Sequence, residues 1–297
     1  MLTAVIWGAA CAGQRAGMET IEPVTFNAAR MILAAAAIGA LTLFIDRKDR
    51  RGLSARTSEE LKNCKKATAI GGICCGTCLA AATISQQMGM VYTDAGKAGF
   101  ITSMYIIFVP VINSLVFKKR SDFMVWAAVF ISAAGMFLLC AADGFSLTRG
   151  DTLIVVCALF FSCHILCCDH FARLGSPIRI SAIQFVTAAL ISAVIAPIAE
   201  EPNWHKISSA ALPILYCGIV SGGIGYTLQM AAQKFTNPTA ASLIMSLEAV
   251  FAVIAGTLLL NEHMSPKELL GCAVMFAAVI MVQFTGSDAQ KEQTSRQ

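Results

Sequence analysis

The feature that most constrains this chain is a succession of apolar segments with little sequence between them. These segments cover residues 2–17, 24–45, 67–91, 97–117, 123–141, 151–170, 179–199, 208–232, 238–260 and 266–285. Most are long enough to cross a bilayer core of about 30 Å as helices. The chain is 57% hydrophobic and 13% charged, whereas a soluble domain carries about 25% charged residues. We therefore predict an all-α integral membrane protein with ten transmembrane helices, whose partners are the lipid bilayer and a small molecule rather than nucleic acid.

The distribution of Lys and Arg predicts the orientation of these helices. If the amino terminus is cytoplasmic, sixteen Lys and Arg residues fall in the inner loops and tail and five on the outer side. Positively charged loops favour the cytoplasmic side of a membrane. We therefore expect a multi-pass protein of the plasma or inner membrane with both termini in the cytoplasm.

The chain also contains an internal repeat. A shift of 143 residues superimposes TISQQMGMVYTDAGKAGFITSMY on YTLQMAAQKFTNPTAASLIMSLE, so that Gln86 matches Gln229 and Tyr105 matches Glu248. Nearer the start of each copy Gln14 matches His164, and after a short insertion Arg30 matches Gln184. A repeat at a fixed period indicates two copies of one structural unit.

The repeat divides the chain into residues 1–142, a first five-helix repeat, and residues 150–286, a second one, followed by a cytoplasmic polar tail at 287–297. Because five is an odd number, the second copy enters the membrane from the opposite side. Many secondary transporters are built from such inverted repeats, which give one site two alternating accesses. We therefore predict two inverted five-helix repeats.

Glu248 lies near the middle of the ninth apolar segment. A charge at that depth costs roughly 2.5–3.5 kcal/mol on insertion scales, and intramembrane carboxylates usually serve a function. We expect Glu248 to lie on a solute or proton pathway. The alternative is a neutral carboxyl that is hydrogen-bonded to a neighbouring helix.

Other polar residues within the apolar segments are candidates for the lining of a cavity. Tyr226 and Gln229 share one helical face with Gln233, and the repeat pairs Gln229 with Gln86. Cavity lining and hydrogen bonding between helices both fit the glutamines.

Arg30, His164, Gln14 and Gln184 complete the set of candidates. Arg30 is always charged, so it snorkels to the interface, pairs with Glu248 or binds an anionic group of a solute. His164 is either a satisfied core histidine or a proton relay. Gln14 and Gln184 fit cavity lining and contacts between helices equally well.

Several other classes of protein are disfavoured. The chain contains no Gly-rich loop for nucleotide phosphates and no nucleophile or zinc-protease motif. Eleven of the twelve cysteines lie in apolar segments, where a free cysteine acts as a small hydrophobe. We therefore expect no metal site and no enzymatic activity. A homodimer is compatible with the sequence but is not required.

Four stretches resemble the drug/metabolite transporter superfamily, in its EamA type with two tandem repeats. They are IWGAACAGQRAG, PVTFNAARMILAA, TDAGKAGFITSMYIIFVPV and SLEAVFAVIAGTLLLNE. The resemblance covers almost the whole chain and implies gradient-coupled movement, often export, of small metabolites such as amino acids, without a cofactor. It makes Glu248 the membrane glutamate of the family. Ala249 stands where the family pattern usually has proline, which removes the residue that would explain a kink there.

The prediction is therefore a secondary active transporter of small metabolites that works by alternating access around a central cavity. Glu248, Tyr226, Gln229, Gln86, Arg30, Gln14, His164 and Gln184 would line the cavity. Glu248 would also couple transport to protons. The alternatives are a multidrug or cation exporter of the same fold, a non-transporting membrane sensor or partner protein, and, less favoured, a membrane enzyme.

Overall fold

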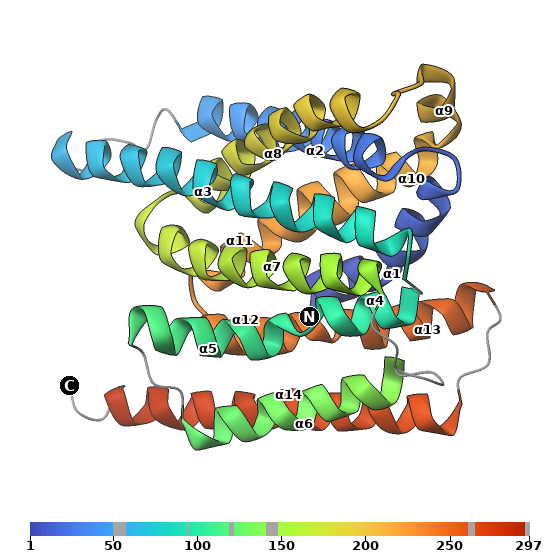
Figure 1. Cartoon of the computed structure of the whole chain (residues 1–297). Helices are drawn as coiled ribbons and strands as arrows, with labels where there is room; N and C mark the ends of the chain where they lie inside the picture. Colours follow the sequence, from blue (N-terminus) through green and yellow to red (C-terminus); the bar gives the residue numbers. More distant parts are fainter. Residues whose placement is uncertain (50–57, 94, 119–121, 141–147, 261–264, 295–297) are drawn as a thin grey trace.

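The computed structural model describes residues 1–49, 58–93, 95–118, 122–140, 148–260 and 265–294, and all regular secondary structure within these ranges is helical (Figure 1). The predicted all-α class is confirmed. In the part of the chain that is described, six helices are long and apolar enough to cross a membrane, and three shorter apolar helices accompany them.

The helices follow one another with short connections. They are α1 (Leu2–Met18), α2 (Pro23–Asp49), α3 (Ser58–Met90), α4 (Ala95–Thr102), α5 (Tyr105–Phe117), α6 (Phe123–Cys140), α7 (Arg149–Leu174), α8 (Pro177–Ala199), α9 (Trp204–Ser209), α10 (Ala211–Leu215), the π-helical segment η2 (Tyr216–Tyr226), α11 (Thr227–Gln233), α12 (Pro238–Ser246), α13 (Glu248–Leu260) and α14 (Pro266–Thr294).

Local sequence explains several helix starts. Thr148 and Asp151 form a capping box at the start of α7, in which each side chain accepts a hydrogen bond from the backbone N–H of the other residue. The side chain of Asn237 accepts from the Ala240 N–H, and Pro238 follows as the first residue of α12. These caps satisfy backbone donors that the first helical turn leaves free.

Three of the expected helices are interrupted. The segment at 97–117 breaks between Thr102 and Tyr105, and the segment at 238–260 breaks at Leu247. The segment at 208–232 contains η2, where a run rich in glycine widens the helix. At the carboxyl end, α14 continues to Thr294, past the expected limit at 285, and residues 295–297 lie outside the described ranges.

Hydrogen bonds between α2 and α8 define two ends of the bundle. Glu200 contacts the start of α2, and Asp46 pairs with Arg179 at the other end of the same two helices. We call these the Glu200 end and the Asp46 end. In Figure 1 they lie to the right and to the left, respectively.

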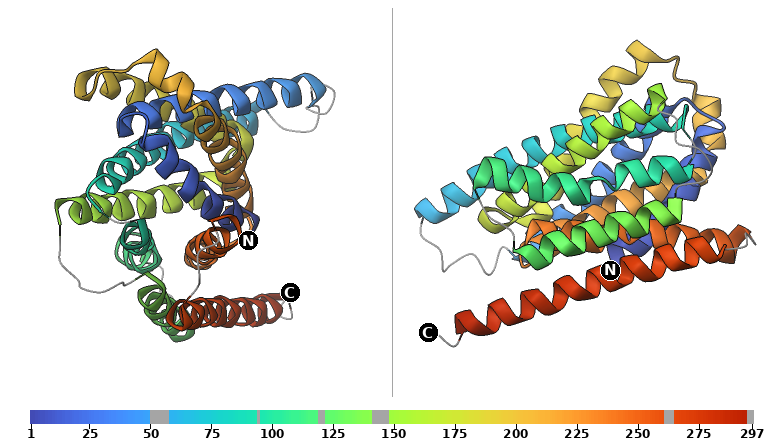
Figure 2. Two further views of the ribbon diagram at one scale, coloured as in Figure 1. Left: turned by 90° about the vertical axis from the view of Figure 1, so that its right-hand side faces the viewer. Right: turned by 60° about the horizontal axis from the view of Figure 1, so that its bottom comes forward.

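Helices from the two halves of the chain pack against each other more than within each half. In particular, α2 packs on α8, α3 on α7 and α8, α1 on α13 and η2, and α6 on α14. Figure 1 and both views of Figure 2 place α6 and α14 side by side at one edge, away from α2 and α8. The core of the protein therefore lies between the halves, and that is where the polar residues meet.

Candidate functional site

The two broken helices place Tyr105 and Glu248 at equivalent positions. Each is the first residue of the helix that follows its break, α5 for Tyr105 and α13 for Glu248. Glu248 remains partly accessible, whereas its neighbours Leu247 and Val250 are fully buried. Broken helices that expose backbone and charged side chains near the midplane are typical of transporter binding sites.

Tyr105 is close enough to Glu248 for the phenol and the carboxyl to interact electrostatically. Its hydroxyl is buried and has no hydrogen-bond partner of ordinary geometry. A buried donor without a partner costs about 1–3 kcal/mol. The pair therefore carries unused hydrogen-bonding capacity at the centre of the protein.

Aromatic side chains surround Tyr226, the last residue of η2. Its ring centroid lies 4.6 Å from that of Trp7, 5.7 Å from that of His164 and 6.0 Å from that of Phe185. The indole N–H of Trp7 donates to the carbonyl of Ser221 at 3.1 Å, which ties α1 to η2. Tyr226 itself is only partly buried. Helices α1, α7 and α8 thus each contribute one ring around it.

The π-helical form of η2 brings this segment close to its neighbours. A Cβ on Gly225 would lie 2.6 Å from the indole nitrogen of Trp7, and one on Gly218 would lie 2.9 Å from the carbonyl oxygen of Arg30. Glycine at both places lets η2 approach α1 and α2.

Arg30 lies on α2 and is 5% exposed. Its Nε donates to Asn27 Oδ1 at 3.0 Å, and Asn27 Nδ2 donates to the hydroxyl of Ser192 on α8 at 3.0 Å. The Nη2 atom is buried without a hydrogen-bond partner. Arg30 forms no ion pair with Glu248 in the described residues, although Tyr226 lies within electrostatic range of both. The internal pair considered in the sequence analysis is therefore not present.

His164 and Gln184 meet between α7 and α8. The ring Nε2 of His164 lies 3.1 Å from Gln184 Oε1 and 3.4 Å from the sulfur of Cys168. The amide nitrogen of Gln184 is buried without a partner. Like Arg30, its counterpart in the repeat, Gln184 therefore offers a free N–H group inside the protein.

The remaining glutamines divide into two groups. Gln87, not Gln86, is fully buried and donates to Gln14 Oε1, whereas Gln86 is partly exposed. Gln229 Nε2 donates to Gln233 Oε1 at 3.1 Å, and Gln233 in turn donates to the carbonyl of Ile165. Gln14 and Gln229 thus lie inside the bundle, while Gln86 does not join the buried set.

The cysteines lie mainly within packed regions. Cys75 and Cys168 face each other across α3 and α7 with their sulfurs 3.8 Å apart, in a cluster that includes Ala172, Ile180 and Met230. Among the residues that the structure describes, no three His, Cys, Asp or Glu side chains gather closely enough to hold a metal ion.

The model of the EamA-like transporter family matches residues 1–141 and again residues 148–284. The chain belongs to the EamA family. It is 27% identical to an uncharacterized transporter of Archaeoglobus fulgidus over 95% of this chain and 83% of that protein. The uncharacterized transporter YoaV of Bacillus subtilis is 22% identical, over 95% of this chain and 94% of the relative. A chloroplastic WAT1-related protein of Arabidopsis thaliana is 23% identical, over 94% of this chain and 67% of the relative.

The EamA fold also has a counterpart among solved structures. One crystal structure superposes with a TM-score of 0.76 over 97% of this chain and 96% of that chain, at 17% sequence identity. Membership of the EamA family and the transporter relatives indicate a multi-pass membrane transporter rather than an enzyme.

Three residues of the site were missing from the sequence-based candidates: Tyr105, Asn27 and Gln87. The repeat superimposes Tyr105 on Glu248, and this match could have identified it. Asn27 precedes Arg30 by three residues and therefore shares its helical face. For Gln87 the sequence carries no such signal, because it adjoins Gln86 and only the rotation of α3 about its axis separates the two.

Proposed function

We propose that this EamA-family chain is a secondary active transporter that moves small metabolites, such as amino acids or related compounds, out of the cell by alternating access. It would span the plasma or inner membrane ten times as two inverted five-helix repeats, residues 1–142 and 150–286, with both termini and the 287–297 tail in the cytoplasm. The positions of Lys and Arg support this orientation. Outward movement is proposed from the family resemblance alone.

The directions of the helices support the inversion. Thr93, after α3, donates to Asp151 at the start of α7, while Thr68, in the first half of α3, accepts from the N–H of Ser176, just before α8. Accordingly α7 runs from the Glu200 end to the Asp46 end. In contrast, α1 runs toward Glu22 and the Glu200 end (Figure 1). The first helices of the two repeats are therefore antiparallel.

The packing pattern supports the same conclusion. The repeat matches α1, α2 and α3 with α7, α8 and η2–α11. Under this match, the contacts of α3 with α7 and α8 predict contacts of η2 with α1 and α2. Both of these contacts occur. The contacts of α7 with α4 and α5 become those of α1 with α12 and α13, which also occur. A two-fold relation between inverted repeats accounts for this correspondence.

The observation that carries the functional proposal is a set of polar side-chain atoms that are buried inside the bundle without hydrogen-bond partners. The Arg30 Nη2, Gln184 Nε2 and Gln229 Oε1 atoms are all buried and without hydrogen-bond partners. A sensor or scaffold with a sealed interior would pair such groups, because each costs about 1–3 kcal/mol when left unsatisfied. A bound solute would satisfy them. The proposed roles are an anionic group of the solute at Arg30 and a proton or a cationic group at Glu248.

The test is the variant Glu248→Gln, with Glu59→Gln, at an exposed position in the first turn of α3, as the matched control. Proteoliposomes loaded with the twenty protein amino acids would be placed under an imposed pH gradient, and the released compounds would be identified by mass spectrometry. We expect release by the parent and by Glu59→Gln, and no gradient-driven release by Glu248→Gln, which should still fold. Full gradient-driven release by Glu248→Gln would refute the role of this carboxyl.

The aromatic rings favour one alternative, an exporter of organic cations. Trp7 and Tyr226 lie close to a carboxyl group, and aromatic faces attract cations. The same proteoliposomes, loaded with tetraphenylphosphonium, distinguish the two functions. A site in which Arg30 binds an anionic group would repel this ligand, because it carries only positive charge. Release of this cation without release of any amino acid would favour the alternative.

A further inference from the structure

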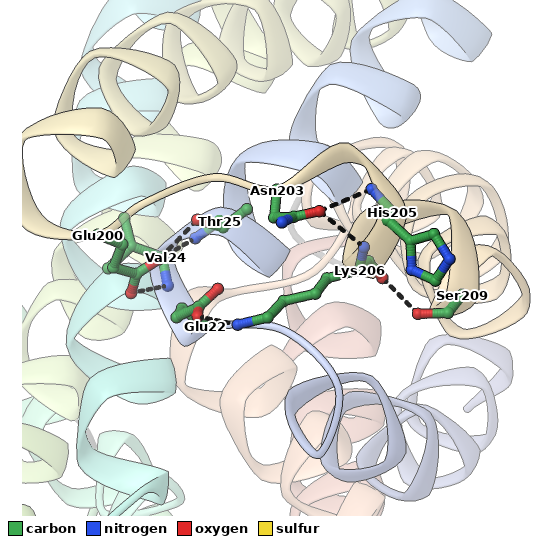
Figure 3. Close-up of polar contacts among 8 residues, drawn as sticks. All are labelled: Glu22, Val24, Thr25, Glu200, Asn203, His205, Lys206 and Ser209. Atoms are coloured by element: carbon green, nitrogen blue, oxygen red, sulfur yellow. Dashed lines mark hydrogen bonds and ion pairs between the residues drawn. The ribbon is translucent and has the colours of Figure 1, made fainter.

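Helices α2 and α8 are joined at both of their ends, although they belong to different halves of the chain. At the Glu200 end, the carboxylate of Glu200 accepts hydrogen bonds from the N–H groups of Val24 and Thr25 at 2.8 and 2.7 Å, and from the Thr25 hydroxyl at 2.7 Å (Figure 3). At the Asp46 end, Asp46 pairs with Arg179, with Nη2 at 2.7 Å and Nε at 3.1 Å from the same carboxylate oxygen.

These two contacts are equivalent in the repeat. The offset of 154 residues that superimposes Arg30 on Gln184 also superimposes Thr25 on Arg179 and Asp46 on Glu200. In each repeat, therefore, an acid at the end of the second helix binds the same position near the start of the second helix in the other repeat. The chemistry differs, since one contact caps a helix and the other is an ion pair, but the positions coincide.

A third contact joins the two helices between these ends. Asn27 Nδ2 donates to Ser192 Oγ, and Asn27 Oδ1 accepts from Arg30 Nε, so that α8 holds Arg30 through Asn27. Arg30 and Gln184 each lie five residues beyond the end contact on their own helix. The α2–α8 pair therefore carries both unpartnered N–H groups, Arg30 Nη2 and Gln184 Nε2.

Rocking of one five-helix repeat against the other would open one end of this interface at a time. In this structure both ends are closed together, and each is closed by a carboxylate that makes two or more hydrogen bonds. Breaking either contact would expose helix-terminal N–H groups or separate a charged pair. If both contacts persist during transport, the motion that gives alternating access passes through other interfaces.

We propose that Asp46 and Glu200 are positioning residues, which clamp α2 and α8 into one body that holds Arg30 and Gln184 at a fixed separation while the other helices move around them. This inference rests on the proposed transport function. In simple rocking each repeat moves as one body, whereas here α2 and α8, which belong to different repeats, stay together.

The test joins both ends covalently. The variant Thr25→Cys/Glu200→Cys/Asp46→Cys/Arg179→Cys would be treated in nanodiscs with a short bis-methanethiosulfonate cross-linker, and the cross-links in each molecule would be counted by mass spectrometry after proteolysis. A parent that carries only its native cysteines and is treated in the same way is the control. We expect both cross-links in the same molecule. A population in which each molecule carries a cross-link at one end only, never at both, shows that the ends close alternately and overturns the proposal.

A second readout uses the amino-acid release assay on this variant. We expect the doubly cross-linked protein to release at least as much as the same variant before cross-linking, since the linker replaces the lost contacts. Release that stops on cross-linking and returns after reduction overturns the proposal. If even the parent releases no amino acid, the proposed substrate class is wrong, while the count of cross-links still decides whether the two ends close together.

Discussion

The contact of α3 with α8 allows a stability prediction at Gly76. A Cβ on Gly76 would lie 2.6 Å from both the carbonyl oxygen of Gln184 and the Cβ of Thr187, and 2.9 Å from the Gln184 Cα. None of these atoms can rotate away, because two belong to the backbone and the third is the branch point of its side chain. Gly76→Ala therefore forces α3 and α8 apart at the level of Gln184.

Gly39 on α2 provides the matched control, because a Cβ there would meet nothing within 4 Å. Overpacking of this kind costs about 1–3 kcal/mol, and we expect the upper half of that range for contacts with rigid atoms. Alanine in place of glycine gains about 1 kcal/mol of helix propensity at either position. We therefore expect Gly76→Ala to lose about 1–2 kcal/mol of unfolding free energy, and the two variants to differ by roughly 2–3 kcal/mol.

The assay is equilibrium unfolding of the two variants and the parent in mixed detergent micelles of increasing denaturing-detergent content. The propensity gain cancels in the comparison, so the difference between the variants isolates the steric effect. If Gly76→Ala and Gly39→Ala unfold within about 0.5 kcal/mol of each other, the close approach of α3 to Gln184 is refuted.

Two further predictions follow from single contacts. Gln87→Ala, which leaves Gln14 without its donor, should lose about 1 kcal/mol of unfolding free energy, near the usual value for hydrogen bonds between membrane helices. The neighbouring variant Gln86→Ala is the control and should lose less. Equal losses in the two variants would contradict the assigned rotation of α3. The hydrogen bond from Lys206 Nζ, 2.7 Å from Glu22 Oε1, holds the pKa of Glu22 below its ordinary value (Figure 3). Its stabilising contribution is therefore present above the unfolded pKa and is lost as the pH falls through the folded pKa. The gap in stability between the parent and Lys206→Gln should therefore be largest above about pH 5 and shrink as the pH falls below the ordinary glutamate pKa of about 4.3. A gap that is constant across pH would exclude this pair as its source.

The sequence predicted most reliably those features of the fold that a bilayer requires. Long apolar segments must be helical in a membrane, because every backbone N–H and C=O needs an internal partner there. This requirement led to the all-α class, and the motif around Glu248 led to the family. The same reasoning selected Arg30, His164, Gln184 and Tyr226 as candidate site residues, because so few polar residues occur within the spans.

Only the tertiary structure determined where helices break, which polar side chains are buried and which distant residues are in contact. No proline marks the break at Leu247, and the free energy that decides between a continuous and a broken helix comes from the packing around it. Likewise, Gln86 and Gln87 have the same chemistry, and only the rotation of α3 about its axis buries one of them. The partners of the Asp46 and Glu200 carboxylates lie more than 130 residues away along the chain. Contacts over such separations depend on the fold that brings α2 beside α8, and they become visible only once that fold is known.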